Sequence, residues 1–130
     1  MSKPVILCVD DQREVLSAIR REMSVFESDY ELVESESARE AEEVLNELND
    51  ANQTVALVIC DHIMPGENGV DFLARINHDS RNKNIRKILL TGLASQQDTI
   101  KAINEAQIDY YLEKPWNSEE LVSIVRKLIE

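Results

Sequence analysis

Glycine and long apolar runs are both scarce in this sequence. The 130 residues include three glycines, and these form neither a G-x-G-x-x-G fingerprint nor a P-loop, which argues against a nucleotide-binding domain of either kind. No apolar run approaches the roughly 20 residues that a membrane-spanning helix needs. The amino terminus also lacks the apolar core and cleavage site of a secretory signal. We therefore expect a soluble, cytoplasmic protein.

Cysteine is scarce as well. Cys8 and Cys60 each lie inside an apolar run, and their spacing fits no common zinc pattern. A free thiol in such a run behaves as a small apolar side chain. We interpret both cysteines as reduced residues of the core.

Basic residues are outnumbered, since 14 lysines and arginines face 25 acidic residues and the net charge is −11. Binding to nucleic acid without sequence preference requires cations that neutralise phosphates, so we expect no direct nucleic acid binding. Because the sequence has no membrane-spanning run, we expect no membrane partner either. The acidic excess between Glu31 and Glu47 is typical of a solvated helix face, and a docking surface for a basic partner is the alternative. One basic cluster is interpreted as solvated loop charge: Arg81, Lys83, Arg86 and Lys87.

Five short β-type runs alternate with helical patterns. Val5 to Val9, Val55 to Cys60 and Ile88 to Leu90 are continuously apolar, as are strands that are buried on both faces of a parallel sheet. Tyr30 to Val33 and Asp109 to Leu112 complete the set. Strict alternation predicts right-handed crossovers with helices on both faces of the sheet. We expect residues 1–130 to form a single doubly wound α/β domain.

Two of the predicted helices begin with recognisable capping signals. Ser37 is followed by Glu40, and Asn117 by Glu120, which is the spacing of a capping box. These signals support the helix boundaries but say nothing about function.

Polar residues follow the predicted strands at their carboxyl ends, where ligands bind in open α/β sheets. The residues in question are Asp10, Asp11, Asp61, Thr91 and Lys114. Three carboxylates brought together raise one another's pKa unless a cation neutralises them, which predicts either a bound metal or a strained site. Oxygen ligands favour Mg²⁺, which is usually held by one or two carboxylates, waters and a substrate phosphate.

A phosphate would also explain the lysine and the hydroxyl at this edge, because both bind phosphate oxygens. A carboxylate can act as a nucleophile and form an acyl phosphate, assisted by a metal. Asp61 is the candidate nucleophile, since it is the lone acid on the central strand, while Asp10 and Asp11 suit the metal. A simpler interpretation of each residue stays open, in which strand ends are polar because they meet solvent and Asp10 or Asp11 caps the next helix.

Four segments resemble the receiver domain of two-component response regulators: ILCVDDQREVL, LVICDHIMPGENGVDFL, ILLTG and YYLEKPW. The resemblance covers essentially the whole chain and includes, in order, an acidic pair, a D-x-x-M-P-x-x-x-G segment, a threonine and a Lys-Pro pair. It implies a flavodoxin-like (βα)5 fold with five parallel strands in the order 2-1-3-4-5.

The resemblance also implies the roles of the acidic residues. Asp61 would accept a phosphoryl group from a phosphohistidine of a sensor histidine kinase or phosphotransfer protein. Mg²⁺ would be bound by Asp61, by Asp11 directly and by Asp10 more often through water, with the backbone carbonyl of Ile63 as a further ligand.

The same resemblance implies a switch. Lys114 would pair first with the phosphoacceptor and then with the phosphoryl group, and a cis bond to Pro115 is implied. Thr91 would move toward a phosphoryl oxygen, and Tyr111 would turn inward behind it. Phosphorylation would then shift a conformational equilibrium that is read out on the face formed by helix four, strand five and helix five.

A receiver of this kind is a signalling module rather than an enzyme, and it assists only its own phosphorylation and dephosphorylation. Its partners would include an unknown downstream protein or an attached output domain, and homodimerisation on phosphorylation is a further family expectation. One alternative is an aspartyl-phosphate phosphohydrolase of the haloacid dehalogenase type, although that family has a second Asp where this chain has Ile63. Another is a degenerate receiver that no longer accepts phosphate.

Two histidines and the single tryptophan have no assigned role in this scheme. His62 and His78 lack a second histidine or a cysteine at metal-ligand spacing, and we interpret both as surface residues. Strand alternation directs His62 away from the acceptor aspartate. Trp116 is expected to be a partly exposed aromatic at the start of helix five.

Three positions depart from common receiver usage. Gln107 stands where receivers often have glycine, so a left-handed backbone there would be adopted at a cost. Ile63 and Leu93 are apolar where some fast-cycling receivers are polar. We expect these apolar side chains to hinder the attacking water and to give a long-lived phosphorylated state.

Overall fold

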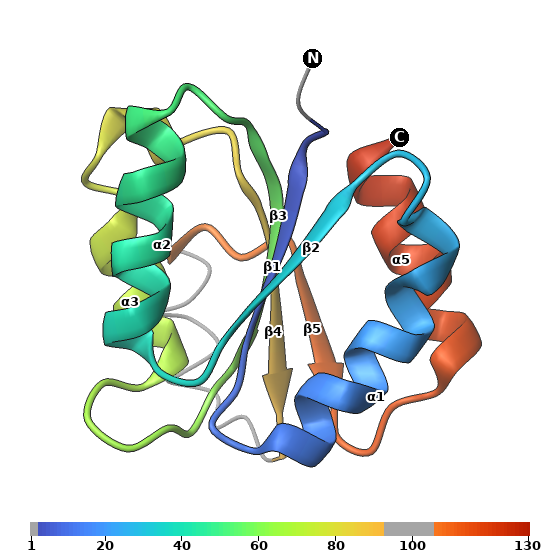
Figure 1. Cartoon of the computed structure of the whole chain (residues 1–130). Helices are drawn as coiled ribbons and strands as arrows, with labels where there is room; N and C mark the ends of the chain where they lie inside the picture. The colour runs from blue at the N-terminus through green and yellow to red at the C-terminus, as the bar shows by residue number, and fades with distance from the viewer. Residues whose placement is uncertain (1–2, 93–105) are drawn as a thin grey trace.

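The computed structural model of the chain describes residues 3–92 and 106–130. Five parallel strands form one sheet in the order β2-β1-β3-β4-β5, and helices cover both of its faces (Figure 1). This topology confirms the predicted flavodoxin-like, doubly wound fold. The strands are β1 (Val5–Val9), β2 (Glu31–Ser35), β3 (Val55–Asp61), β4 (Arg86–Thr91) and β5 (Tyr110–Glu113).

Figure 1 shows α2 (Ala38–Asp50) and α3 (Gly69–Ile76) on one face of the sheet, with α1 (Arg13–Met23) and α5 (Ser118–Ile129) on the other. Two short 3-10 helices, η1 (Ser24–Phe26) and η2 (Ser80–Asn82), follow α1 and α3. The predicted fourth helix falls mainly outside the described residues. The part of the chain that the structure describes includes no helix long and apolar enough to span a bilayer.

The apolar runs of β1, β3 and β4 supply two separate cores. Side chains alternate along each strand, so that Val58 and Cys60 pack under α2 and α3, while Leu57 and Ile59 pack under α1 and α5. Both cysteines are buried and free, which confirms that prediction. Burial raises the pKa of the Cys8 thiol to about 12, so this thiol stays protonated at neutral pH.

Both predicted helix caps are present. The hydroxyl of Ser37 accepts a hydrogen bond from the Glu40 amide, and the side-chain oxygen of Asn117 accepts one from the Glu120 amide, each at 3.1 Å. These bonds satisfy amides that have no partner inside the helix.

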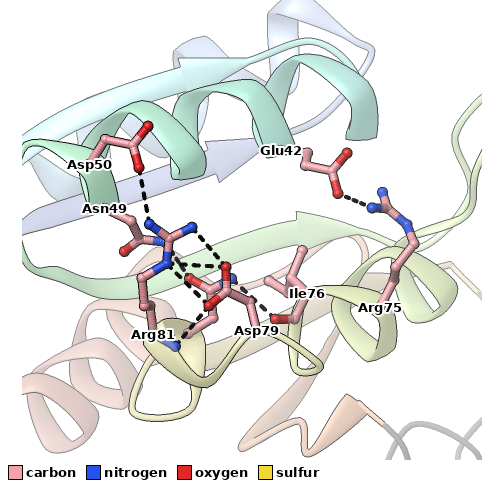
Figure 2. A network of polar contacts seen from close by, with 8 residues as sticks. Glu42, Asn49, Asp50, Arg75, Ile76, Asp79 and Arg81 are labelled. Carbon is pink, nitrogen blue, oxygen red and sulfur yellow. Dashed lines mark hydrogen bonds and ion pairs between the residues drawn. The ribbon is translucent and has the colours of Figure 1, made fainter.

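Polar contacts at the surface tie α2 to α3 and η2 (Figure 2). Arg75 of α3 pairs with Glu42 of α2. The guanidinium of Arg75 also forms a two-pronged contact, at 2.7 and 3.0 Å, with Glu67 in the β3–α3 loop. Arg81 of η2 reaches Asp50 of α2 at 3.0 Å. These side chains are partly to largely exposed to solvent, so each pair stabilises the fold only weakly.

The prediction of solvated loop charge is wrong for Lys87. Its side chain is 1% exposed, and its ammonium donates a hydrogen bond to the Ile85 carbonyl at 3.2 Å. The reason is that β4 already begins at Arg86, which makes Lys87 a strand residue on the same buried face as Leu89. Burial lowers the pKa of Lys87, and the charge of Asp109 opposes this only in part.

The structure also describes Gln107, before β5, and Trp116, before α5, and the partial exposure predicted for Trp116 is confirmed. The backbone of Gln107 does adopt the left-handed conformation, which a residue other than glycine adopts at a cost, with φ of 54°. Trp116 is partly buried against the core beneath α1 and α5, and its indole N–H donates to the Glu22 carboxylate at 2.5 and 3.0 Å. The tryptophan thereby connects the start of α5 to α1.

Candidate functional site

The carboxyl ends of four neighbouring strands bring the predicted site residues to one edge of the sheet. Asp10 directly follows β1, and Asp61 ends β3 beside it. Asp61 pairs with Leu90 of β4, the residue before Thr91. The Thr91 carbonyl accepts a hydrogen bond from the Lys114 amide at 2.8 Å, which fixes the end of β5 to the end of β4.

The three predicted acidic residues form a cluster. Carboxylate oxygens of Asp10, Asp11 and Asp61 all lie within 4.8 Å of one another. Asp10 and Asp61 are buried, whereas Asp11 is exposed. Oxygen donors at this spacing are the kind of ligand that Mg²⁺ prefers. Metal binding by the carbonyl of Ile63 stays a prediction; the Ile63 side chain is 71% exposed.

Lys114 bridges two of these carboxylates. Its ammonium lies 2.6 Å from Asp61 Oδ1 and 3.3 Å from Asp10 Oδ2. Burial acts to lower the pKa of Lys114, but the hydrogen bond to Asp61 and the charges of both acids outweigh it and raise the pKa above its ordinary value. The ammonium is therefore charged at neutral pH. The Lys114-Pro115 bond is cis, as the resemblance implied.

The environment of Asp10 favours a further cation. Burial raises the pKa of Asp10, a hydrogen bond from the Gln12 amide at 2.9 Å opposes that rise, and the charge of Asp61 adds to it. Lys114 alone thus leaves the ionised form of Asp10 destabilised. Asp10 does not cap α1, because the residue at the helix N-cap is Gln12 and no side chain caps it.

A glycine allows the chain to fold back closely behind Asp61. A Cβ atom on Gly69 would lie 2.1 Å from the Asp61 carbonyl oxygen, which is closer than any real contact. The Gly69 amide donates to the His62 carbonyl at 2.7 Å, and Asn68 caps α3 by accepting from the Asp71 amide at 2.8 Å. The glycine of the D-x-x-M-P-x-x-x-G segment is therefore required by the space between β3 and α3.

The prediction that His62 lies at the surface is wrong. Its side chain is 4% exposed, and its Nδ1 lies 3.2 Å from the Thr91 hydroxyl oxygen, which is equally buried. Strand alternation places His62 on the same face as Cys60, and this face is covered by α2 and α3 rather than by water. The signal in the sequence is Gly69, which allows the start of α3 to pack directly against the end of β3 and so to enclose His62.

Tyr111 lies on β5 opposite Leu89 and is partly buried against the core beneath α2 and α3. Burial raises its pKa, so the phenol stays protonated at neutral pH. Its switching role stays a prediction. Leu93 and most of the predicted fourth helix lie outside the described residues, so the output face is described only in part.

The chain matches one protein family over most of its length. The model of the response regulator receiver domain matches residues 6–126, a range that includes every candidate site residue. The chain is similar to the hydrogenase transcriptional regulatory protein HoxA of Cupriavidus necator, at 33% identity over 125 residues, which are 96% of this chain and 24% of HoxA. It is also similar to the transcriptional regulatory protein CpxR of Escherichia coli, at 32% identity over 95% of this chain and 48% of CpxR. The chain therefore spans at most about half the length of these two relatives.

Solved structures agree with this assignment. The signal receiver domain of an HD domain-containing protein from Pseudomonas fluorescens Pf-5 has a TM-score of 0.83 and 34% identity, covering 98% of this chain and 94% of that one. Chemotaxis protein CheY4 of Vibrio cholerae has a TM-score of 0.80 at 22% identity, with 98% and 99% covered, which shows a shared fold.

Proposed function

Because the chain belongs to the response regulator receiver domain family, we propose that Asp61 accepts a phosphoryl group from the phosphohistidine of a sensor histidine kinase or phosphotransfer protein. The observation that carries this proposal is the contact of Lys114 with Asp61 at 2.6 Å, inside a cluster of three carboxylates. A buried acid with a fixed cation at the end of the central strand is poised to react with a phosphoryl donor.

In the proposed reaction an oxygen of Asp61 forms the new bond to phosphorus, while the bond from phosphorus to the histidine nitrogen of the donor breaks. Lys114 holds Asp61 in place before the reaction and offsets the charge on the phosphoryl oxygens afterwards. The Thr91 hydroxyl donates to one of these oxygens. The chain thus assists its own phosphorylation and dephosphorylation, and we propose no other enzymatic activity.

Receiver domains bind Mg²⁺ at an acidic pocket, and the residues present here fit that ion. Asp10, Asp11 and Asp61 would hold it, together with the carbonyl of Ile63. When bound, the ion screens the repulsion between the acceptor carboxylate and the incoming phosphoryl group. It would also offset the cost of keeping the buried Asp10 ionised.

We propose that Thr91 and Tyr111 relay phosphorylation to the face that contains β5 and α5. A downstream protein or an attached output domain would read this face, and homodimerisation on phosphorylation is part of the proposal. The names of HoxA and CpxR describe transcriptional regulatory proteins, which is consistent with an output that lies outside this segment. We further propose that residues 1–130 act as one cytoplasmic receiver domain.

The central experiment is to incubate the chain with acetyl phosphate and Mg²⁺ and to weigh the intact protein. We expect an adduct of one phosphoryl group per chain. This adduct should not form in Asp61→Asn, nor in the unmodified chain when a chelator has removed Mg²⁺ before the donor is added. Turnover of many phosphate esters without an adduct would instead support the phosphohydrolase, and the absence of both adduct and turnover would support a degenerate receiver.

The lifetime of this adduct tests the role of the apolar residue beside the acceptor. Ile63 follows Asp61 by two residues, and its exposed side chain should hinder the water that attacks the phosphoryl group. We expect the adduct to persist well beyond seconds after the donor is removed, and to decay faster in Ile63→Asn. Loss of the adduct within seconds in the unmodified chain would contradict this expectation.

A further inference from the structure

One polar contact at the carboxyl edge lies outside the acid cluster and joins two buried side chains. His62 Nδ1 and Thr91 Oγ1 are 3.2 Å apart, within hydrogen-bond distance, and each side chain is 4% exposed. Water therefore competes poorly for this bond. Either atom can be the donor, depending on which ring nitrogen of His62 carries the proton.

The backbone of His62 is fixed on both sides. Its amide donates to the Leu90 carbonyl at 2.8 Å, which continues the β3–β4 ladder one residue beyond Asp61. Its carbonyl accepts from the Gly69 amide, at the first turn of α3, at 2.7 Å. The imidazole is large and His62 is only 4% exposed, so packing around the ring limits its rotation and the fold sets the position of Nδ1.

Thr91 is held from the other direction. It ends β4, and its carbonyl accepts from the Lys114 amide, so its backbone is also fixed. The freedom that remains is rotation of the Thr91 side chain, and the contact with His62 selects one rotamer of that side chain.

We propose that His62 is a positioning residue that retains the Thr91 hydroxyl in the unphosphorylated arrangement. This inference rests on the proposed function, in which the same hydroxyl donates to a phosphoryl oxygen on Asp61. A threonine hydroxyl has a single proton to donate. In the tautomer whose Nδ1 accepts the proton of the Thr91 hydroxyl, phosphorylation must exchange the contact with His62 for a contact with the phosphoryl group, and His62 sets how readily that exchange occurs.

The size of the effect follows from the energy of one hydrogen bond. A typical buried hydrogen bond contributes enough to change an equilibrium by about 2- to 10-fold. Removing the nitrogen of His62 should therefore raise the affinity for beryllofluoride, a phosphoryl analogue, by about that factor in the presence of Mg²⁺. Fluorescence of Trp116, the single tryptophan, provides the readout.

Three substitutions separate the hydrogen bond from the bulk of the side chain. In His62→Asn a polar atom takes the place of Nδ1, whereas in His62→Gln the polar atoms lie further out, at the place of Nε2. In His62→Phe the ring remains without either nitrogen. We expect His62→Asn to bind beryllofluoride as the unmodified chain does, and His62→Gln and His62→Phe to bind it more tightly.

Removing the other partner completes the test. In a Thr91→Val background, which lacks the hydroxyl, replacing His62 by Phe or Gln should leave the affinity for beryllofluoride unchanged. A purely structural role would give the same change in both backgrounds and would not be rescued by Asn. Either of these two results would overturn the inference. If His62→Phe does not fold, His62→Gln supplies the comparison.

A final measurement does not depend on phosphorylation. Without Mg²⁺ or donor, the NMR couplings of the Thr91 side chain should report one rotamer in the unmodified chain and in His62→Asn, but averaging in His62→Gln. Averaging in the unmodified chain would contradict the inference even if Asp61 accepts a phosphoryl group. If instead no adduct forms while the rotamer behaves as expected, the proposed function fails and the contact with His62 still holds Thr91.

Discussion

Two lysines, the buried Lys87 and the partly buried Lys114, lie at opposite ends of the parallel strands, and their surroundings affect their pKa values in opposite ways. Lys114 follows β5 and contacts both Asp61 and Asp10, and its pKa is raised. Lys87 lies at the start of β4, where its ammonium donates to the Ile85 carbonyl, and its pKa is lowered. Burial acts to lower the pKa of both residues, so the difference comes from their partners.

The comparison shows how the two edges of one sheet are specialised. At the carboxyl edge three carboxylates lie close together, and the ammonium of Lys114 contacts two of them. At the amino ends of the strands the charge of Asp109 acts on Lys87, but its carboxylate accepts the hydrogen bond of the Lys87 backbone amide, at 2.8 Å. The charge of Lys114 therefore stabilises the carboxylates of the candidate site, whereas burying the charge of Lys87 lowers the stability of the fold.

The largest effect should come from crowding the carboxyl edge itself. Gly69→Ala places a Cβ atom 2.1 Å from the Asp61 carbonyl, and we expect it to lower the free energy of unfolding by about 3 kcal/mol. Phosphorylation of Asp61 by acetyl phosphate should also slow, because α3 and the end of β3 must move apart. Urea unfolding and intact mass measure the two effects.

Gly92→Ala is the matched control for this prediction. No atom of the described residues lies within 4 Å of a Cβ atom at Gly92, so the substitution should change the stability little. Equal losses in the two variants would show that the contact behind Asp61 is not the cause.

Replacing each lysine by methionine tests whether the acidic partners cause the difference between Lys114 and Lys87. Lys114→Met leaves Asp10 and Asp61 without their cation and should lower the free energy of unfolding, measured without metal, by about 2 kcal/mol. Lys87→Met removes a desolvated charge and keeps a flexible chain of similar length, so it should raise the stability by about 1 kcal/mol. If both variants changed the free energy of unfolding in the same direction, the acidic partners of Lys114 would not explain the difference between the two lysines.

The pH dependence of stability should distinguish Lys87 further. Its folded pKa lies below the 10.5 of the unfolded chain, so between these values the unfolded chain binds more protons and stability rises with pH. Lys87→Met lacks this contribution, and its stability advantage over the unmodified chain should shrink as the pH rises toward 10.5. Urea unfolding of both proteins at several pH values measures the difference. A constant difference would mean that Lys87 keeps an ordinary pKa.

The smallest effect is expected at the exposed ion pairs that tie α2 to α3 (Figure 2). Arg75→Met removes contacts with Glu42 and Glu67, yet solvent screens these charges, so the loss should be below about 1 kcal/mol. High salt should reduce the difference between this variant and the unmodified chain, whereas the effect of Lys114→Met should depend less on salt. If Arg75→Met instead lowered the free energy of unfolding by several kcal/mol at every salt concentration, the contacts of Arg75 would behave like the more buried contacts of Lys114.

Much of the fold could be predicted because the central strands are continuous apolar runs. The predicted range of β1, Val5 to Val9, is the observed one, because its buried apolar run is bounded by Pro4 and Asp10. The edge strand β2 was predicted over Tyr30 to Val33 and is observed over Glu31–Ser35. Its half-exposed residues give a weaker pattern, so its ends are set by pairing with β1.

The sequence by itself determined the strand and helix alternation and which residues end the strands at the carboxyl edge, because both follow from the order of apolar and polar residues along the chain. Only the tertiary structure decided the surroundings of His62 and Lys87. Strand alternation assigns a side chain to one face of a sheet, but it does not reveal what covers that face. The close return of the chain at Gly69 and the early start of β4 enclose these two residues, and that is why a histidine and a lysine with ordinary surface patterns are buried.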